Sequence, residues 1–166
     1  ALQQVKMVPT LRPELTSLSA EFTLPDYLGR SGSERKDARG GAVTLVKGTQ
    51  VEFTAQASRD LASATVNGRP VNPATNSLST GKLLVENSTQ LEIQWRDALG
   101  LAGKNPFNLA VTARDDEAPT VACEDLPRQK VLLESEQLTF LLHAHDDFGI
   151  RQVGLEWNGL NQDGSP

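Results

Sequence analysis

Carboxylate side chains gather at two places in this sequence where they could bind calcium. Asp115, Asp116 and Glu117 follow one another, and Asp146 and Asp147 stand side by side further along the chain. Calcium takes about six to eight oxygen ligands, and neighbouring carboxylates can supply several of them. Aspartate is also an ordinary turn residue, because its side chain accepts hydrogen bonds from nearby backbone N–H groups. The sequence leaves both interpretations open, a calcium site and acidic turns.

The two histidines and the single cysteine could also do chemistry. His143 and His145 stand two residues apart, and on a strand they would project from one face, where a third ligand could complete a zinc or copper site. A polar outer sheet face, or a pH-sensitive surface, accounts for the same pair without a metal. Cys123 has no intrachain disulfide partner and shares a strand face with Val121, so we expect a buried, unreactive thiol.

Trp95 and Trp157 could stack on sugar rings, as exposed aromatic side chains do in carbohydrate-binding domains. Each shares its strand face with apolar neighbours, which favours a place in the hydrophobic core. The sequence contains no G-x-S-x-G motif and no glycine-rich phosphate loop before a helix. Nothing in it points to a catalytic centre, and we expect a protein that is not an enzyme.

Composition and charge narrow the classes of protein that fit this chain. It has 166 residues, 38% of them hydrophobic, which suffices for one large or two small domains. Acidic and basic residues are mixed and the formal net charge is −5, which argues against a nucleic-acid partner. The basic residues between Gly29 and Gly41 alternate with acids and have no aromatic neighbour, so we expect a solvated loop there.

An internal repeat organises the elements that must position these residues. In each copy an alternating strand, containing Phe53 or Phe140, leads to an acidic turn at Asp60 or Asp147 and then to a second alternating strand. The spacing from Phe53 to Asp60 equals that from Phe140 to Asp147, and both copies end at Asn-Gly. A period of two residues predicts β-strands and excludes helices, so one β unit occurs twice.

The charged, proline-containing segment at 114–119 is typical of a boundary between two modules. Before it we expect about seven or eight short strands, the pattern of an immunoglobulin-like sandwich, and after it only about four. The predicted fold class is therefore all-β, with tandem immunoglobulin-like β-sandwich modules at 14–114 and 118–166, the second incomplete. Residues 1–13 are expected to form an entry strand or tail. The second module should contain strands at 120–123, 129–134, 138–144 and 153–157, while 73–80 should be a loop.

Seven large residues on the alternating faces are expected in the core: Phe53, Ile93, Trp95, Phe140, Val153, Leu155 and Trp157. About four strands cannot close a sandwich whose sheets protect each other, so the second module needs a cover. Val153, Leu155 and Trp157 are thus also a candidate interaction surface. The first module, residues beyond Pro166 in the natural protein, or a second chain paired at an open strand edge could cover them.

Three short motifs resemble those of a known family. The A-H-D-D-F-G-I turn at 144–150 is similar to turns in bacterial tandem immunoglobulin-like repeats of cell-envelope proteins, and D-E-A-P at 116–119 resembles the joint between such repeats or cadherin-like modules. P-D-Y-L-G at 25–29 adds a likeness to the extracytoplasmic region of large, membrane-anchored bacterial proteins of uncharacterised function. The D-x-N-D part of the cadherin calcium signature is missing.

The resemblance implies a periplasmic or cell-surface location and a membrane anchor outside this fragment. It implies a non-catalytic spacer and protein-interaction surface, whose partners are other proteins, neighbouring modules of the same chain or a second copy at a strand edge. An alternative from a different class is a carbohydrate-binding or adhesive accessory module attached to an enzyme. Binding of a polysaccharide that depends on a tryptophan would distinguish the two.

Overall fold

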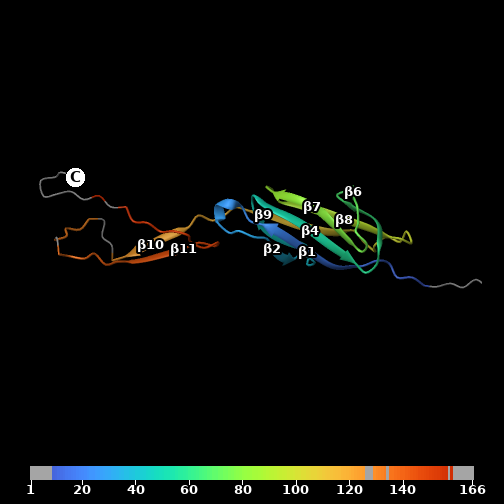
Figure 1. Cartoon of the computed structure of the whole chain (residues 1–166), viewed down its shortest axis with the longest axis horizontal. Helices are drawn as coiled ribbons and strands as arrows, with labels where there is room; N and C mark the ends of the chain where they lie inside the picture. Colours follow the sequence, from blue (N-terminus) through green and yellow to red (C-terminus); the bar gives the residue numbers. More distant parts are fainter. Residues whose placement is uncertain (1–8, 126–128, 134, 157, 159–166) are drawn as a thin grey trace, which may run out of the picture. The chain divides into compact units, whose positions relative to one another are not determined.

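The computed structural model describes residues 9–125, 129–133, 135–156 and 158. This part of the chain is all-β apart from one short 3-10 turn, Asp26–Leu28, which confirms the all-β class that the sequence predicts (Figure 1). It separates into two compact units, and the division falls between Asp116 and Glu117. That position lies in the charged segment that the sequence analysis assigned to the module boundary.

Four antiparallel strands form one sheet of the first unit, in the order β2-β1-β4-β7. The central strands β1 (Leu15–Thr23) and β4 (Thr49–Ala57) pair along most of their length. The edge strands are β2 (Glu34–Asp37) and β7 (Ser77–Val85). Side chains on β1 and β4 alternate between buried and more exposed, which is the period of two that the sequence predicts.

Five strands form the second sheet of this unit, in the order β3-β9-β8-β5-β6. Strand β3 runs parallel to β9, and the remaining pairs are antiparallel. The first unit thus holds nine strands in its described residues, slightly more than the sequence predicts. The bounds are β3 (Ala42–Val46), β5 (Leu61–Val66), β6 (Arg69–Val71), β8 (Thr89–Asp97) and β9 (Phe107–Arg114).

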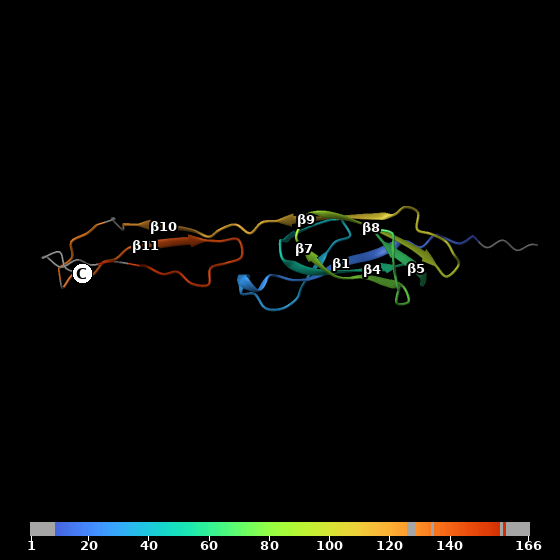
Figure 2. The ribbon, with the colours of Figure 1, turned by 90° about the horizontal axis from the view of Figure 1, so that it is seen from above.

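The two sheets pack as a β-sandwich, with β8 and β9 on one side and β1 and β4 on the other (Figure 2). Their inward side chains form the core. Phe53 and Ile93 are fully buried and Trp95 is 7% exposed, which confirms the burial predicted for these three residues. Most of the other buried side chains are small aliphatic residues from the same strands, among them Leu18, Ala20, Val51, Ala55, Leu91, Leu109 and Val111.

A tight hairpin joins β5 to β6 at Asn67 and Gly68, as the Asn-Gly pair predicts. Val66 is paired with Arg69, so only these two residues form the turn. Both have positive φ, 50° at Asn67 and 74° at Gly68, which a primed turn requires and which these residue types tolerate.

Two loops predicted for the first unit are wrong in part. Residues 34–37 of the supposed basic loop form β2, because β1 offers them an edge to pair with and the Arg35 Nη2 donates to the Ser19 hydroxyl (3.0 Å). The predicted loop at 73–80 ends earlier, at Ser77, where β7 begins. Leu78 in this segment is buried, so its packing against the core overrides the polar, turn-forming composition around it.

The second unit contains one two-stranded antiparallel ribbon, β10 (Thr120–Glu124) with β11 (Leu141–His145). The strands predicted at 129–134 and 153–157 are wrong for the residues that the structure describes there, 129–133 and 153–156, which carry no strand. A strand exists only where a neighbour accepts and donates its backbone hydrogen bonds. Among the described residues of this unit, only β10 and β11 offer each other such a neighbour.

Candidate functional site

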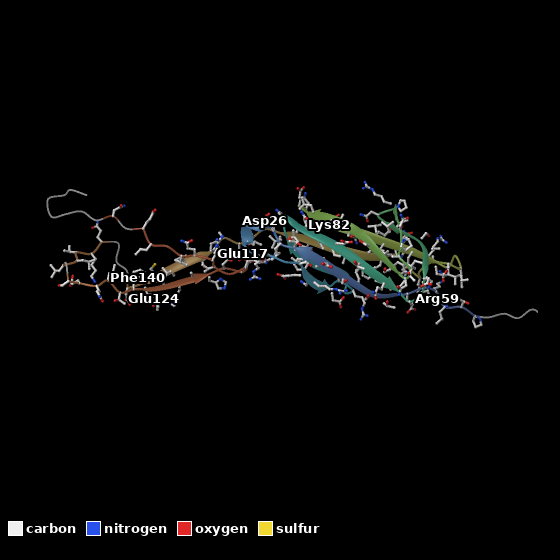
Figure 3. All side chains as sticks on the ribbon, viewed as in Figure 1. Asp26, Arg59, Lys82, Glu117, Glu124 and Phe140 are labelled. Atoms are coloured by element: carbon white, nitrogen blue, oxygen red, sulfur yellow. The ribbon has the colours of Figure 1, made fainter. Side chains whose placement is uncertain are left out.

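The second unit exposes large apolar side chains on both faces of its ribbon and in the segments outside the ribbon, and we call this set of residues the unit-2 apolar surface. Val153 is 41% exposed and Leu155 is 49% exposed, so the prediction that they lie in the core is wrong. Phe140, which precedes β11 (Figure 3), is half-buried and also departs from that prediction. Trp157 lies outside the described residues. The further exposed members of the surface are Val121, Val131, Leu132, Leu133, Leu141 and Ile150.

The strand predicted at 138–144 begins only at Leu141, but its predicted alternation is present along the whole segment. Leu138, Phe140, Leu142 and Ala144 are half-buried, and the residues between them are exposed. The period of two therefore sets which side chains share a face. It does not set whether that face is covered, and without a second sheet these residues keep contact with water.

Cys123 is exposed, so the prediction of a buried thiol is wrong. It is paired with Leu142 of β11 and so lies on the half-buried face, as the alternation requires. All five residues of β10 are exposed. The reason is again the missing layer, because a side chain on the inner face of an uncovered ribbon remains accessible.

The acidic residues that could bind calcium make local contacts instead of forming one cluster. The Asp115 carboxylate pairs with the Lys47 ammonium at 2.6 Å, between side chains that are 81% and 46% exposed. The Asp146 carboxylate accepts a hydrogen bond from the Phe148 N–H (3.0 Å), as turn-forming aspartates do. Across the residues that the structure describes, no three His, Cys, Asp or Glu side chains gather closely enough to hold a metal ion. Calcium binding by Asp115, Asp116, Glu117, Asp146 and Asp147 stays a prediction.

His143 and His145 project from the same face of β11, as predicted, and both are exposed. The His143 Nε2 lies 3.6 Å from a carboxylate oxygen of Glu124 on the neighbouring strand. The His145 carbonyl accepts a hydrogen bond from the Thr120 hydroxyl (3.4 Å). The single carboxylate beside His143 fits the polar outer sheet face that accounts for the histidine pair without a metal.

Asp97 is a turn-forming acid, as its residue type predicts, but its burial was not predicted from the sequence. It is 2% exposed, and one of its carboxylate oxygens accepts hydrogen bonds from the N–H groups of Leu99 (2.9 Å) and Leu101 (2.8 Å). The other oxygen lies 3.5 Å from the guanidinium of Arg59, which is labelled in Figure 3. The sequence contains a signal for this burial, since Asp97 follows Ile93 and Trp95 at the two-residue spacing of side chains that face the core. This carboxylate orders the turn that follows β8.

Trp95 serves the core and not an exposed stacking platform, as predicted. Its Nε1 donates to the carbonyl oxygen of Pro13 at 3.1 Å, and Pro13 is itself buried. Gly103 lies so close to the indole that a Cβ added there would come within 2.8 Å of the ring. The ring is therefore enclosed by its own sandwich, by Pro13 and by the loop after β8.

Two wider findings complete the description. Among the described residues, no helix is long and apolar enough to cross a membrane. Comparison with models of protein families, with curated proteins and with solved structures found no significant match to this chain. The functional argument therefore depends on the contacts and exposure described above.

Proposed function

We propose that this chain is a non-catalytic pair of immunoglobulin-like modules, acting as a spacer and protein-interaction surface in the extracytoplasmic part of a bacterial envelope protein. The unit-2 apolar surface carries the interaction part of this proposal. Apolar side chains that are exposed on a small β unit lower the free energy of a complex when a partner removes them from water. The bacterial, periplasmic or cell-surface part depends on the resemblance of the A-H-D-D-F-G-I and D-E-A-P motifs.

The strand order of the first unit supports the immunoglobulin-like assignment. In such sandwiches the strands A, B and E share one sheet and C, F and G share the other. Here β1, β4 and β7 occupy the positions of A, B and E, while β5, β8 and β9 occupy those of C, F and G. Strand β6 extends the second sheet beside β5, as the strand after C does in variable-type domains.

The second unit repeats the beginning of this order. Strands β10 and β11 pair antiparallel, as β1 and β4 do, and β11 is the strand that the internal repeat aligns with β4. The described residues 151–156 would then take the place of β5, the first strand of the opposite sheet. This correspondence supports two related modules in tandem, of which the second lacks part of its layers here.

The carbohydrate-binding alternative has less support from the structure. Of its two candidate tryptophans, the structure describes Trp95, and that ring is buried and hydrogen-bonded through Nε1. An aromatic platform for a sugar needs an exposed ring face. The alternative would regain weight if a polysaccharide bound the intact chain and binding disappeared in a folded Trp157→Ala variant.

Site-specific photo-crosslinking tests the proposed surface. A photoreactive amino acid replaces Leu141 in the second unit or, as the matched control, Leu84 in the first, since these leucines are 52% and 56% exposed. The chain is exported to the periplasm of a bacterial host, irradiated and analysed for protein adducts. We expect adducts at position 141, with a partner protein or a second copy of the chain, and few at position 84.

Charge substitutions give the second arm of this test. The triple variant Leu133→Glu, Leu141→Glu, Leu155→Glu should abolish the adducts, whereas Leu11→Glu, Leu84→Glu, Leu99→Glu should leave them unchanged. All six leucines are exposed, so neither variant should unfold the first unit. Equal adduct yields at positions 84 and 141, or adducts that survive the first triple variant, would contradict the proposal.

A further inference from the structure

A polar hollow of about 210 Å³ lies on the outer face of the second sheet in the first unit, and we call it the Arg96 pocket. Its floor and one wall come from neighbouring strands, through the cross-strand pairs Ser63 with Arg96 and Thr65 with Gln94. These four side chains alternate with the buried Ala64 and Trp95, so they project away from the core. The loop after β8 supplies the opposite wall, including Asn105.

The wall formed by the loop is held in place from within the fold. The buried Asp97 carboxylate fixes the start of the loop through the N–H groups of Leu99 and Leu101. Further along, the Gly103 N–H donates to the Trp95 carbonyl (3.2 Å), and Ala102 forms an isolated β-bridge with Arg96. A loop anchored at both ends keeps its shape without a ligand, which reduces the entropy lost on binding.

The polar groups that line the pocket are largely uncommitted. Within the described part of the chain, the Arg96 guanidinium forms no ion pair, and its hydrogen bond to the Gly100 carbonyl is long, at 3.4 Å. The side chains of Ser63, Thr65 and Asn105 form no hydrogen bond to any described residue. Guanidinium, amide and hydroxyl groups can all donate, and no carboxylate lines this hollow. Such a set of donors is complementary to an anion.

Another hollow of the same unit also contains arginines and serves as a comparison for the Arg96 pocket. The hollow beside β1 and β2 is lined by Arg35, Lys36 and Arg39 but also by Asp37. There, Arg35 donates to Ser19, and Arg39 donates to the Thr16 carbonyl (3.1 Å). Each of these arginines, like Arg96, donates one side-chain hydrogen bond, so the two hollows differ in the carboxylate of Asp37, which has no counterpart in the lining of the Arg96 pocket.

We infer that the Arg96 pocket binds the carboxylate of an aspartate or glutamate side chain on a protein partner. The arginine fork matches the two oxygens of a carboxylate, and the hydroxyls of Ser63 and Thr65 with the amide of Asn105 supply further donors. The volume is below the roughly 300–1,000 Å³ of sites for drug-sized ligands, so it accepts one side chain and not a larger molecule. This inference goes beyond the unit-2 apolar surface and does not depend on it.

An acidic sugar is a less suitable occupant for the same pocket. Sugar rings bind against exposed aromatic faces, and Trp95, the aromatic residue in the lining, is enclosed by Gly103 and hydrogen-bonded to Pro13. One negative charge lies nearby, because the Gln94 side-chain amide donates to the Glu92 carboxylate at 2.6 Å. This charge weakens anion binding and provides a variant with an expected effect of opposite sign.

The test uses the whole chain labelled with 15N and four small probes in an NMR titration. The probes are N-acetyl-glutamate amide, its neutral isostere N-acetyl-glutamine amide, glucuronate and inorganic phosphate. We expect N-acetyl-glutamate amide to shift the signals of the Arg96 Nε–H, the Asn105 side-chain amide and the backbone of residues 63–65. The neutral isostere should bind at least about fivefold more weakly, since it lacks the charge that the guanidinium recognises.

Three variants complete the experiment. Arg96→Gln should weaken binding of N-acetyl-glutamate amide at least about fivefold, Glu92→Gln should strengthen it about twofold, and Arg69→Gln, an exposed arginine on the same sheet, should leave it unchanged. Thermal melts of each variant establish that the fold is intact. Binding that survives Arg96→Gln, equal binding of the neutral isostere, equal binding of phosphate, or tighter binding of glucuronate would overturn the inference.

Discussion

The strand pairs β1–β4 and β10–β11 begin the two units in the same way, but only the first pair has a buried inner face. In the first pair, Leu18 and Ala20 face Ala55 and Phe53, and all four side chains are buried. In the second, the partner of Cys123 is Leu142, and neither of them is buried. Both pairs have the alternation and the antiparallel ladder of a sandwich sheet. They differ in whether a second sheet lies over the inner face.

This difference teaches that a hydrophobic pattern specifies a face, whereas burial requires a partner layer. Strand β5 exists because β8 pairs with it and places Trp95 and Ile93 beside it. The corresponding residues 151–156 have the same alternation but no strand beside them, and they form none. Each buried aliphatic side chain stabilises a fold by about 1.5–3 kcal/mol, and the described residues of the second unit gain little of this.

Hydrogen exchange should show the largest contrast between the two units. Backbone amides of β4 and β8 are expected to exchange only through global unfolding, with protection of about 5 kcal/mol or more, typical of a folded domain. Amides of β10 and β11 should exchange through local opening at much lower free energy, because an isolated two-stranded ribbon is marginal in water. Mass spectrometry after short labelling times measures both. Equal protection in the two strand pairs would break the comparison.

Truncating the matched phenylalanines should show the next largest effect. Phe53→Ala removes a fully buried ring and should lower the free energy of unfolding by about 3–5 kcal/mol. Phe140→Ala, at the equivalent position of the repeat, removes a half-buried ring and should cost less than about 1 kcal/mol. Urea denaturation followed by tryptophan fluorescence measures both variants. A loss for Phe140→Ala as large as that for Phe53→Ala would indicate a closed core in the second unit.

Replacing one turn aspartate in each unit, Asp97 or Asp146, compares how much a polar side chain contributes to the stability of the two units. Asp97→Ala leaves the N–H groups of Leu99 and Leu101 without their buried acceptor, so it should cost about 2–3 kcal/mol. Asp146→Ala removes one acceptor, from the Phe148 N–H at a less buried turn, and should cost about 0.5 kcal/mol. Thermal or urea unfolding measures the pair. Reversed magnitudes would mean that the turn of the second unit, and not that of the first, bears more of the stability.

The fold of the first unit could be predicted from the sequence because its signals are local. The sequence pattern identified β1, β3, β4, β5, β8 and β9, and the Asn-Gly pair identified the hairpin after β5. Strand β2 was missed because its residues are charged and exposed, so no apolar periodicity marks it, and it forms by pairing with the edge of β1. In the described residues 129–133 and 153–156 the expected strands failed for the complementary reason, since their pattern was present and no described strand pairs with them.

The candidate sites divide in the same way. The shared face of His143 and His145 and the core position of Trp95 follow from strand periodicity, and the structure confirms both. The Arg96 pocket could not be predicted, because it joins two neighbouring strands with a loop whose path depends on the buried Asp97. The strongest signal in the sequence is that Asp97 follows three apolar residues on the inward-facing side of β8. That signal identifies the residue that supports the loop, and not the pocket itself.

The smallest expected effect concerns Asp115, which precedes the last residue of the first unit and begins the predicted calcium set. Its ion pair with Lys47 is largely exposed, so Asp115→Asn should lower the free energy of unfolding by no more than about 0.5 kcal/mol. Calcium would have to displace the ammonium at 2.6 Å, and we therefore expect calcium chloride to shift the melting temperature by less than about 1 °C. A true site, at calcium about 100-fold above its Kd, would add about 2.7 kcal/mol instead. Such a rise, present in the wild type and lost in Asp115→Asn, would establish the acidic residues as calcium ligands, while a flat titration in both would leave them as turn and ion-pair residues.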